Sequence, residues 1–131
     1  MRTEIRNEWD EVLRTIEELN SRGVEVRWNN MMMFLQDANI IILNDYVWER
    51  LENTESNEIQ KGDYKKLSEI CKTHNKKRWR RLFLKILFKW NIQIPMIVSY
   101  DTDKYYLISG NTRLCINKVL GRKPKVIFAT I

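Results

Sequence analysis

The distribution of apolar and polar residues is most regular in the last third of the chain. Residues 94–100 are apolar on both faces, a pattern typical of a buried strand. Residues 101–104 read Asp-Thr-Asp-Lys, a compact turn signal, and residues 105–108 are again mostly apolar. Together these three segments predict a β-hairpin.

A helix is predicted directly after the hairpin. Gly110 gives the backbone the freedom for a sharp exit from the second strand, and apolar residues then recur at helical spacing over residues 114–120. Gly121 is a typical helix end, and residues 125–131 follow as a last apolar strand. The pattern thus changes from strand to helix within Ser109–Arg113.

The rest of the chain predicts further elements around this unit. In chain order they are a helix that Thr3 caps and residues 20–23 end, a weak strand at Val24–Trp28, a buried helical or irregular segment at Met31–Leu35, a central strand at Ala38–Leu43, a helical turn or two at Asp45–Leu51, a loop at Glu52–Gly62, a helix from Asp63 to His74 and an amphipathic helix at Lys76–Trp90. We therefore expect one α+β domain over residues 1–131, with a small mixed sheet covered by helices. Residues 1–37 form an acidic helical addition, and residues 38–131 form the core.

The strand-to-helix turn is the best candidate binding site. The first N–H groups of a helix have no partner within the helix, and the helix dipole adds partial positive charge, so an anion is stabilised there. Thr112 offers a hydroxyl, Asn111 an amide and Arg113 a planar guanidinium that suits phosphate or carboxylate. We predict ligand binding at Ser109, Gly110, Asn111, Thr112 and Arg113. In a simpler hypothesis, Ser109 or Asn111 caps the helix and Arg113 pairs with a surface carboxylate.

The ordered set of motifs resembles the ParB/sulfiredoxin superfamily. The residues that carry the resemblance are Ile94-Pro95-Met96-Ile97-Val98, the hairpin, Tyr106-Leu107-Ile108-Ser109-Gly110-Asn111-Thr112-Arg113-Leu114, Gly121 and Pro124-Lys125-Val126-Ile127. In that family a Pro-led strand, a strand ending in Gly, a G-x-x-R turn and a short helix closed by Gly form a nucleotide-phosphate site. The resemblance covers residues 78–131. It implies a stand-alone ParB-like domain of the kind found in phages and mobile elements, with a nucleotide or nucleic acid as ligand and a role in nucleic-acid metabolism or host takeover.

The same resemblance limits the chemistry. Members that hydrolyse nucleotides carry Glu and two arginines after the Gly, whereas only Arg113 matches here. Sulfiredoxins carry a catalytic Cys where Asn111 stands, so we do not expect repair of cysteine sulfinic acid. Some relatives are nucleases or small-molecule kinases, and phosphoryl chemistry needs a carboxylate that holds Mg²⁺ or orients a nucleophile. The candidates, by position alone, are Asp37, Asp45 and Glu49.

Charge is unevenly distributed along the chain. Residues 1–60 hold six Lys/Arg and thirteen Asp/Glu, and residues 61–131 hold seventeen and four, so a net charge of +6 divides into −7 and +13. This asymmetry suggests an electropositive face for polyanions, although the two halves can simply pack against each other.

The predicted helix at residues 76–90 has an apolar stripe and a basic row. Such a helix can contact phosphates, a partner protein or a membrane surface. The resemblance favours packing of the stripe on the sheet, which leaves the basic row exposed. The alternative function is therefore a non-enzymatic module that binds DNA or an acidic protein through this row. Its residues are Lys77, Arg78, Arg81, Lys85 and Lys89.

Other classes of protein are not indicated. No apolar run approaches the roughly 18 residues of a membrane span, and residues 1–20 are too acidic for a signal peptide. We therefore expect a soluble, cytoplasmic protein without a membrane partner. Cys71 and Cys115 lie in separate helical patterns, and His74 is the single histidine, so we expect reduced thiols and no metal site.

Overall fold

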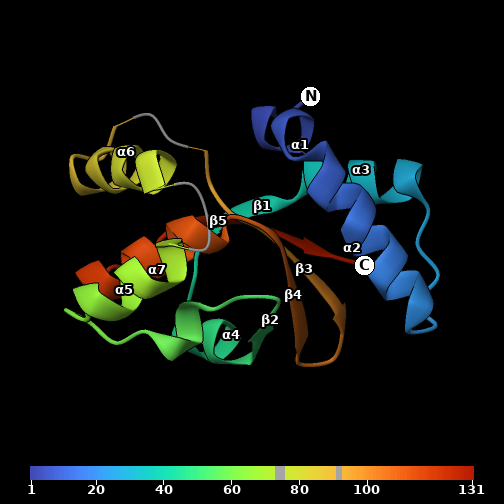
Figure 1. Cartoon of the computed structure of the whole chain (residues 1–131). Coiled ribbons are helices and arrows are strands. Elements are labelled where there is room, and N and C mark those ends of the chain that lie inside the picture. Colours follow the sequence, from blue (N-terminus) through green and yellow to red (C-terminus); the bar gives the residue numbers. More distant parts are fainter. Residues whose placement is uncertain (73–75, 91–92) are drawn as a thin grey trace.

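The structure is a computed structural model that describes residues 1–72, 76–90 and 93–131. A five-stranded mixed sheet lies between two layers of helices (Figure 1). The strand order is β1-β5-β3-β4-β2, with β1 at Asn39–Ile42, β2 at Leu51–Glu52, β3 at Met96–Asp101, β4 at Lys104–Ser109 and β5 at Lys125–Thr130. The α+β class predicted from the sequence is confirmed.

Strand β3 lies in the middle of the sheet because both of its faces are apolar. It pairs antiparallel with β4 in the predicted hairpin and parallel with β5. Met96 and Val98 pack toward one helical layer and Ile97 toward the other, and all three are fully buried. The two-sided apolar pattern of residues 94–100 therefore identified the central strand correctly.

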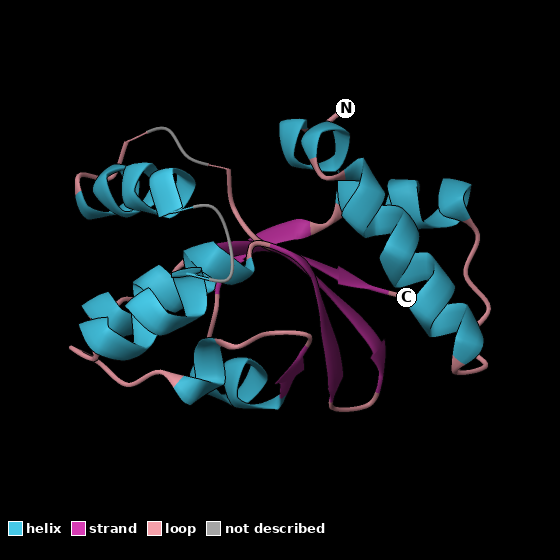
Figure 2. Ribbon diagram, viewed as in Figure 1, coloured by secondary structure: helices cyan, strands magenta, loops and turns pink. Residues whose placement is uncertain are grey.

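The first helical layer is built from the N-terminal part of the chain (Figure 2). It consists of α1 (Thr3–Asn7), α2 (Trp9–Ser21) and α3 (Trp28–Asp37). Its buried residues share one apolar cluster with β3, β4 and β5. Met31 and Leu35 belong to this cluster, whereas Met33 and Phe34 are 61% and 39% exposed, so Met31–Leu35 is helical as predicted but only partly buried. Residues 1–37 are acidic, but they form an integral layer of the core.

The second layer covers the opposite face of the sheet. It consists of α4 (Asp45–Arg50), the short 3-10 helix η1 (Ser56–Glu58), α5 (Tyr64–Lys72), α6 (Lys76–Leu87) and α7 (Asn111–Leu120). Helices α4 and α7 contact the sheet directly through Val47, Trp48 and Leu114. Helices α5 and α6 pack on the outer side of α7. The resemblance had implied that the apolar stripe of α6 packs on the sheet, but it packs on helices, because α7 already covers that face.

Several local predictions are wrong. The run Ala38–Leu43 was expected in the centre of the sheet, but β1 is an edge strand in which Ile40 and Ile42 are 53% and 61% exposed. Residues 24–27 form no strand, and Trp28 begins α3. The helix expected from Thr3 to Leu19 is interrupted at Glu8. In each case the apolar positions were identified correctly, but contacts with distant segments determined which element these residues form.

The N-terminal helix also lacks its expected cap, and α6 ends earlier than predicted. Thr3 is the first residue of α1 and makes no capping hydrogen bond. Helix α6 ends at Leu87, and Trp90 lies beyond it with 61% of its surface exposed. The predicted helix through His74 is α5, which is described only to Lys72, so His74 lies outside the described residues.

The junction between β4 and α7 depends on Gly110. Its φ of 105° lies in a region that side-chain-bearing residues rarely adopt. A Cβ atom at this position would lie 2.7–2.9 Å from atoms of Pro95, the residue that precedes β3. Gly121 ends α7 with a second positive φ, of 68°. Both glycines therefore act where the sequence predicted a sharp exit and a helix end.

We expect Gly110→Ala to destabilise the protein more than Gly62→Ala does. Gly62 also has a positive φ, of 82°, but no atom lies within 4 Å of the point that a Cβ atom would occupy there. Both substitutions incur the cost of a left-handed residue, about 1–2 kcal/mol. Only Gly110→Ala adds overpacking against Pro95, about 1–3 kcal/mol more. Urea unfolding of both variants measures the difference, and equal free energies of unfolding would contradict the proposed close contact.

Candidate functional site

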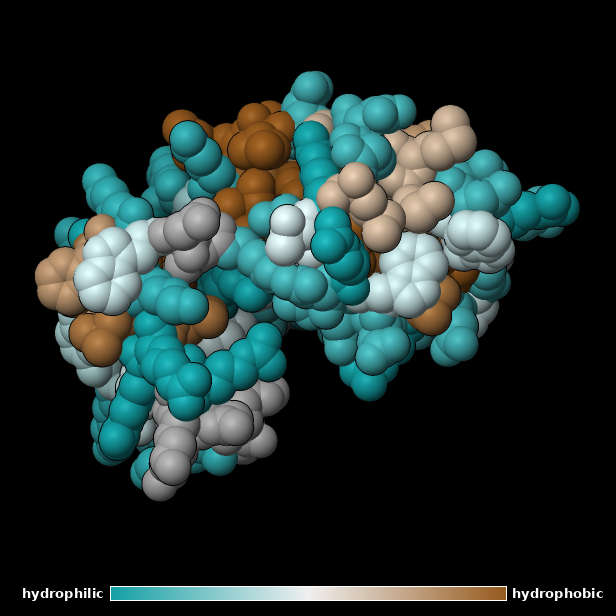
Figure 3. Space-filling model, turned by 90° about the horizontal axis from the view of Figure 1, so that it is seen from above, coloured by the Kyte–Doolittle hydropathy of each residue, from teal (hydrophilic) through white to brown (hydrophobic). Residues whose placement is uncertain are grey.

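A cavity of about 720 Å³ lies at the N-terminal end of α7. This volume is in the range of small-molecule sites. The walls come from α1–α2, the segment after β2, α6, the end of β4 and the first turn of α7. The lining residues are Glu8, Glu11, Asn53, Thr54, Glu55, Arg78, Trp79, Leu82, Leu107, Ile108, Ser109, Gly110, Asn111, Thr112 and Arg113. Seen from above, the outline of the molecule is indented between two lobes (Figure 3).

All five residues predicted from the turn line this cavity. Gly110 occupies the N-cap position of α7, and no side chain makes a capping hydrogen bond. The hypothesis that Ser109 or Asn111 caps the helix is therefore wrong. The first turn of α7 lines the cavity, and its backbone N–H groups have no acceptor within the helix.

Arg113 is buried, with only 7% of its surface exposed. Its Nη1 lies 3.7 Å from a carboxylate oxygen of Glu8, and its Nε has no hydrogen-bond partner. Burial lowers the pKa of Arg113, and the Glu8 carboxylate opposes this effect. Glu8 is itself largely buried, so the expected pair with a surface carboxylate is replaced by a loose pair inside the molecule.

A second buried group beside Arg113 is also unsatisfied. Among the described residues, Ser109 Oγ and Arg113 Nε are the buried side-chain polar atoms without a hydrogen-bond partner. A buried polar group without a partner costs about 1–3 kcal/mol. The two groups are four residues apart in sequence and line the same cavity. Both groups can donate a hydrogen bond to an acceptor oxygen.

Asn111 serves a structural purpose that the sequence did not indicate. Its Oδ1 accepts hydrogen bonds from Thr54 Oγ1 at 2.8 Å and from the Glu55 backbone N–H at 2.9 Å. Its Nδ2 donates to Glu55 Oε1 at 3.2 Å. The amide that we expected to offer to a ligand is therefore engaged by the protein. The same hydrogen bonds hold the Glu55 side chain at the start of α7.

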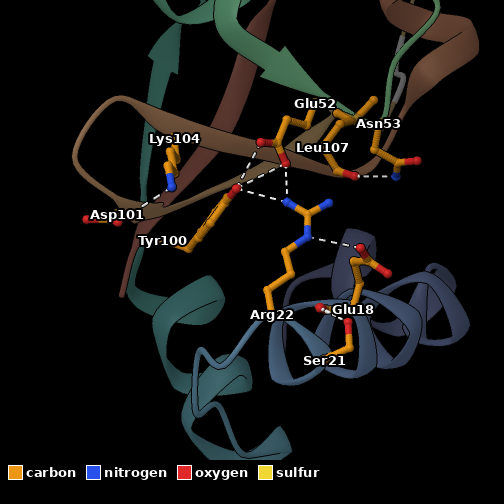
Figure 4. A network of polar contacts seen from close by, with 9 residues as sticks. All are labelled: Glu18, Ser21, Arg22, Glu52, Asn53, Tyr100, Asp101, Lys104 and Leu107. Carbon is orange, nitrogen blue, oxygen red and sulfur yellow. Dashed lines mark hydrogen bonds and ion pairs between the residues drawn. The ribbon is translucent and has the colours of Figure 1, made fainter.

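A polar network fixes the other end of the 52–55 segment (Figure 4). Arg22, at the end of α2, donates to Glu52 and, at 2.9 Å, to the hydroxyl of Tyr100. Tyr100 in turn donates to Glu52 Oε1 at 2.9 Å. The carboxylates of Glu52 and Glu18 raise the pKa of the Arg22 guanidinium. Asn53 Nδ2 donates to the Leu107 carbonyl at 2.8 Å, so the segment is anchored on β4 as well.

The predicted loop Glu52–Gly62 is therefore packed against the core and is not a detached surface loop. Ser56 is fully buried and accepts a hydrogen bond from Trp48 Nε1 at 2.8 Å, and Ile59 belongs to the core under α7. Near the end of the segment, the Gly62 N–H donates to the Val119 carbonyl. These contacts place Thr54 and Glu55 at the cavity from a segment far away in the sequence.

The basic residues that the sequence predicted as one row on a helix lie in different environments in the structure. Arg78 lines the cavity beside Trp79 and Leu82. Arg81 and Lys85 are exposed on α6. Lys89 lies beyond the end of the helix, with a φ of 55°, and is exposed. The side chain of Lys77 lies outside the described residues. The expected continuous row on one helix is therefore wrong at Lys89.

The carboxylates proposed for catalysis do not reach the cavity. Asp45 is exposed at the start of α4, where it lies 3.3 Å from Lys123 Nζ. Glu49 is exposed on the same helix, and Asp37 is exposed at the end of α3. The carboxylates near the turn are Glu8, Glu11 and Glu55. The sequence pattern did not indicate that these carboxylates lie near the turn, because they come from two separate segments.

The two cysteines are buried beneath the site. Burial raises the pKa of the Cys71 thiol to about 11 and that of the Cys115 thiol to about 12, so both are protonated at neutral pH. Cys115 Sγ lies 3.9 Å from Asn111 Oδ1. Within residues 1–72, 76–90 and 93–131, no group of three or more His, Cys, Asp or Glu side chains is placed to hold a metal ion.

Comparison with protein-family models, curated proteins and solved structures gave no match to this chain. In the part of the chain that the structure describes, no helix is long and apolar enough to cross a membrane.

We expect Asn111→Ala to release the 54–55 segment from α7. The substitution removes two accepted hydrogen bonds and one donated bond, and it should lower the free energy of unfolding by about 1–3 kcal/mol. The Glu55 amide, which donates to Asn111, should exchange its hydrogen faster. Asn57→Ala is the control, because Asn57 lies on the same segment but donates to the Trp48 carbonyl. Unchanged exchange at Glu55 in Asn111→Ala would show that other contacts hold the segment.

Proposed function

We propose that this protein is a ParB-like domain that binds the phosphate of a nucleotide or nucleic acid at Gly110–Arg113. The observation that carries the proposal is the buried Arg113, which lines the cavity at the start of α7 and whose Nε has no hydrogen-bond partner. A helix N-terminus alone would be a weak argument. The unsatisfied Ser109 Oγ beside it adds an independent group that suits a ligand oxygen.

The chemistry of these groups favours phosphate over a neutral ligand. Arg113 presents a planar fork of donors, and a charge-assisted hydrogen bond to phosphate is about twice as strong as a neutral one. The N–H groups and the dipole of α7 add positive potential at the same point. Since Arg113 is largely removed from water, an anion there would be screened less than on the surface.

The apolar part of the lining suits the base of a nucleotide. Trp79 and Leu82 of α6 line the cavity together with Leu107 of β4. Trp79 also makes an edge contact with Phe83, with ring centroids 6.5 Å apart, which holds its ring in place. An aromatic face of this kind stacks with any base and gives about 1–3 kcal/mol per base. A nucleotide with its phosphate at α7 and its base toward α6 would use both walls.

Binding without turnover is the expected behaviour. The family's hydrolytic members carry Glu after the Gly, whereas Asn111 stands here and its amide is engaged by Thr54 and Glu55. Mg²⁺ is commonly bound by one or two carboxylates together with substrate phosphates. Glu8 and Glu55 line the cavity beside the turn, so they are the residues that would hold such an ion.

We expect Arg113→Ala to weaken nucleotide binding by about 10- to 150-fold, because a charge-assisted hydrogen bond worth about 1.5–3 kcal/mol is lost. Affinities are compared only after circular dichroism shows that the variant is folded, because Arg113 is buried beside Glu8 and its removal leaves that carboxylate without a partner. Isothermal titration calorimetry with AMP, ATP, CMP and CTP measures the effect. Arg81→Ala is the matched control, because Arg81 is an exposed arginine that does not line the cavity. Equal affinity of Arg113→Ala and the parent would refute the site.

A second candidate function is binding of nucleic acid on the outer surface of α6. Arg81 and Lys85 are exposed on α6, and Lys89 is exposed just beyond the end of the helix. Beyond the end of the helix, Phe88 and Trp90 are 59% and 61% exposed and stack on each other at 5.6 Å. Basic residues next to exposed aromatic rings favour contacts with a single-stranded backbone and its bases. This surface is separate from the cavity, so the two functions can be tested independently.

If α6 binds nucleic acid, affinity should fall with salt at a log–log slope of roughly −2 to −3, as three contacts with phosphate require. Changing Arg81, Lys85 and Lys89 to Gln should flatten the slope without changing nucleotide binding in the cavity. The control changes the exposed Lys104, Lys123 and Lys125 to Gln, which alters net charge equally at another surface. If the parent binds neither DNA nor RNA at low salt, an acidic protein is the better partner for this surface.

A further inference from the structure

Glu8 occupies a break between two helices. Its φ of −112° and ψ of 28° are not helical, so it separates α1 from α2. The break is nevertheless bridged, because the Glu8 N–H donates to the Glu4 carbonyl and the Val12 N–H donates to the Glu8 carbonyl. The backbone of Glu8 is therefore held in place, and its side chain lines the cavity beside Arg113.

The carboxylates that line the cavity differ in their hydrogen bonds. Glu11 and Glu55 each accept a hydrogen bond from another side chain, at 2.8 Å and 3.2 Å. The Glu8 carboxylate lies 3.7 Å from Arg113 Nη1, which is longer than the roughly 2.7–3.2 Å of an N–H···O hydrogen bond. Only 18% of the Glu8 side chain is exposed. Among the described residues, Glu8 is thus a largely buried carboxylate whose capacity to accept a hydrogen bond is not used.

The groups around Arg113 offer both donors and an acceptor to a ligand. The donors are Arg113 Nε and Ser109 Oγ, which have no partner among the described residues, and the first N–H groups of α7. The acceptor is the Glu8 carboxylate. A hydroxyl oxygen that accepts from Arg113 Nη1 at about 2.9 Å and donates to Glu8 at about 2.6 Å is compatible with the 3.7 Å between these two groups.

Tetrahedral oxyanions differ in whether they can supply such a hydroxyl. A phosphate monoester has a second pKa of about 6, so a part of it carries a P–OH group near neutral pH. A sulfate ester and the phosphodiester of a nucleic-acid backbone are fully ionised there and present only acceptor oxygens. Next to a carboxylate an acceptor oxygen is repelled, whereas a P–OH group donates a charge-assisted hydrogen bond.

We propose that Glu8 selects an oxyanion that carries a proton, so that the site takes a terminal phosphate and rejects a sulfate ester or a phosphodiester. The inference rests on the proposed phosphate site and specifies the class of phosphate that it takes. In the complex the P–OH group donates to Glu8. The remaining oxygens accept from Arg113, Ser109 and the N–H groups of α7. The ligand brings the proton with it, so the protein neither gains nor loses one.

The test compares three ligands that differ in this proton. AMP, adenosine 5′-sulfate and the methyl ester of AMP are titrated at pH 6 into the parent and into Glu8→Gln, by isothermal titration calorimetry with EDTA at fixed ionic strength. We expect the parent to bind AMP at least about tenfold more tightly than either analogue, as the loss of one charge-assisted hydrogen bond requires. Glu8→Gln should reduce this ratio by about tenfold, because its neutral amide accepts a weaker hydrogen bond and does not repel the analogues.

Two controls accompany this comparison. Inorganic phosphate and inorganic sulfate, titrated in the same way, remove any contribution of the base, and the parent should again prefer phosphate. Glu17→Gln removes the same charge as Glu8→Gln, but Glu17 is exposed on α2 and does not line the cavity. This variant should keep the preference of the parent.

The outcomes separate this inference from the proposed function. Equal affinity of the parent for AMP and its two analogues would overturn the selection by Glu8 while the phosphate site stands. An equal gain in affinity for all three ligands in Glu8→Gln would do the same, since it would show that Glu8 only repels anions. Absence of binding of AMP and of inorganic phosphate to both proteins would overturn the phosphate site, and the inference with it. If Glu8→Gln does not fold, the ratio measured for the parent decides alone.

Discussion

The close contact between Gly110 and Pro95 is the constraint on which the site depends. A side chain at position 110 would clash with Pro95, which precedes β3. Because this residue is glycine, the chain can leave β4 and enter α7 directly. This exit fixes the first turn of α7 at the cavity and sets its apolar residues against the sheet and against α5 and α6. A looser junction would not hold the backbone N–H groups and Arg113 in one place.

The N-terminal layer has two roles that depend on each other. Ile5 and Val12, on either side of the break at Glu8, are fully buried against the sheet. Burial of an aliphatic side chain of this size contributes about 1.5–3 kcal/mol, which offsets the cost of interrupting a helix. The interruption aims the Glu8 carboxylate at Arg113. The layer therefore stabilises the core and also supplies a wall of the cavity.

The segment that follows β2 connects the two layers at the site. Arg22 from the first layer holds Glu52, while Asn111 from the second holds Thr54 and Glu55. Loops that carry functional residues are commonly positioned by rigid elements in this way. Because both anchors are polar and contact the segment directly, the position of Glu55 depends on the correct packing of α2 and α7 against the same sheet.

The sequence determined the hairpin, the last strand, α7 and the turn around Gly110, because each is specified by local alternation or by a glycine. It did not reveal that β1 is an edge strand, since a run of isoleucines does not show which strands pair with it. Its candidates for catalysis, Asp45 and Glu49, do not line the cavity. Glu8 and Glu55 lie far from the turn in sequence, and they contact Arg113 and Asn111 respectively only because the helical layers pack on one sheet, which only the tertiary structure could decide.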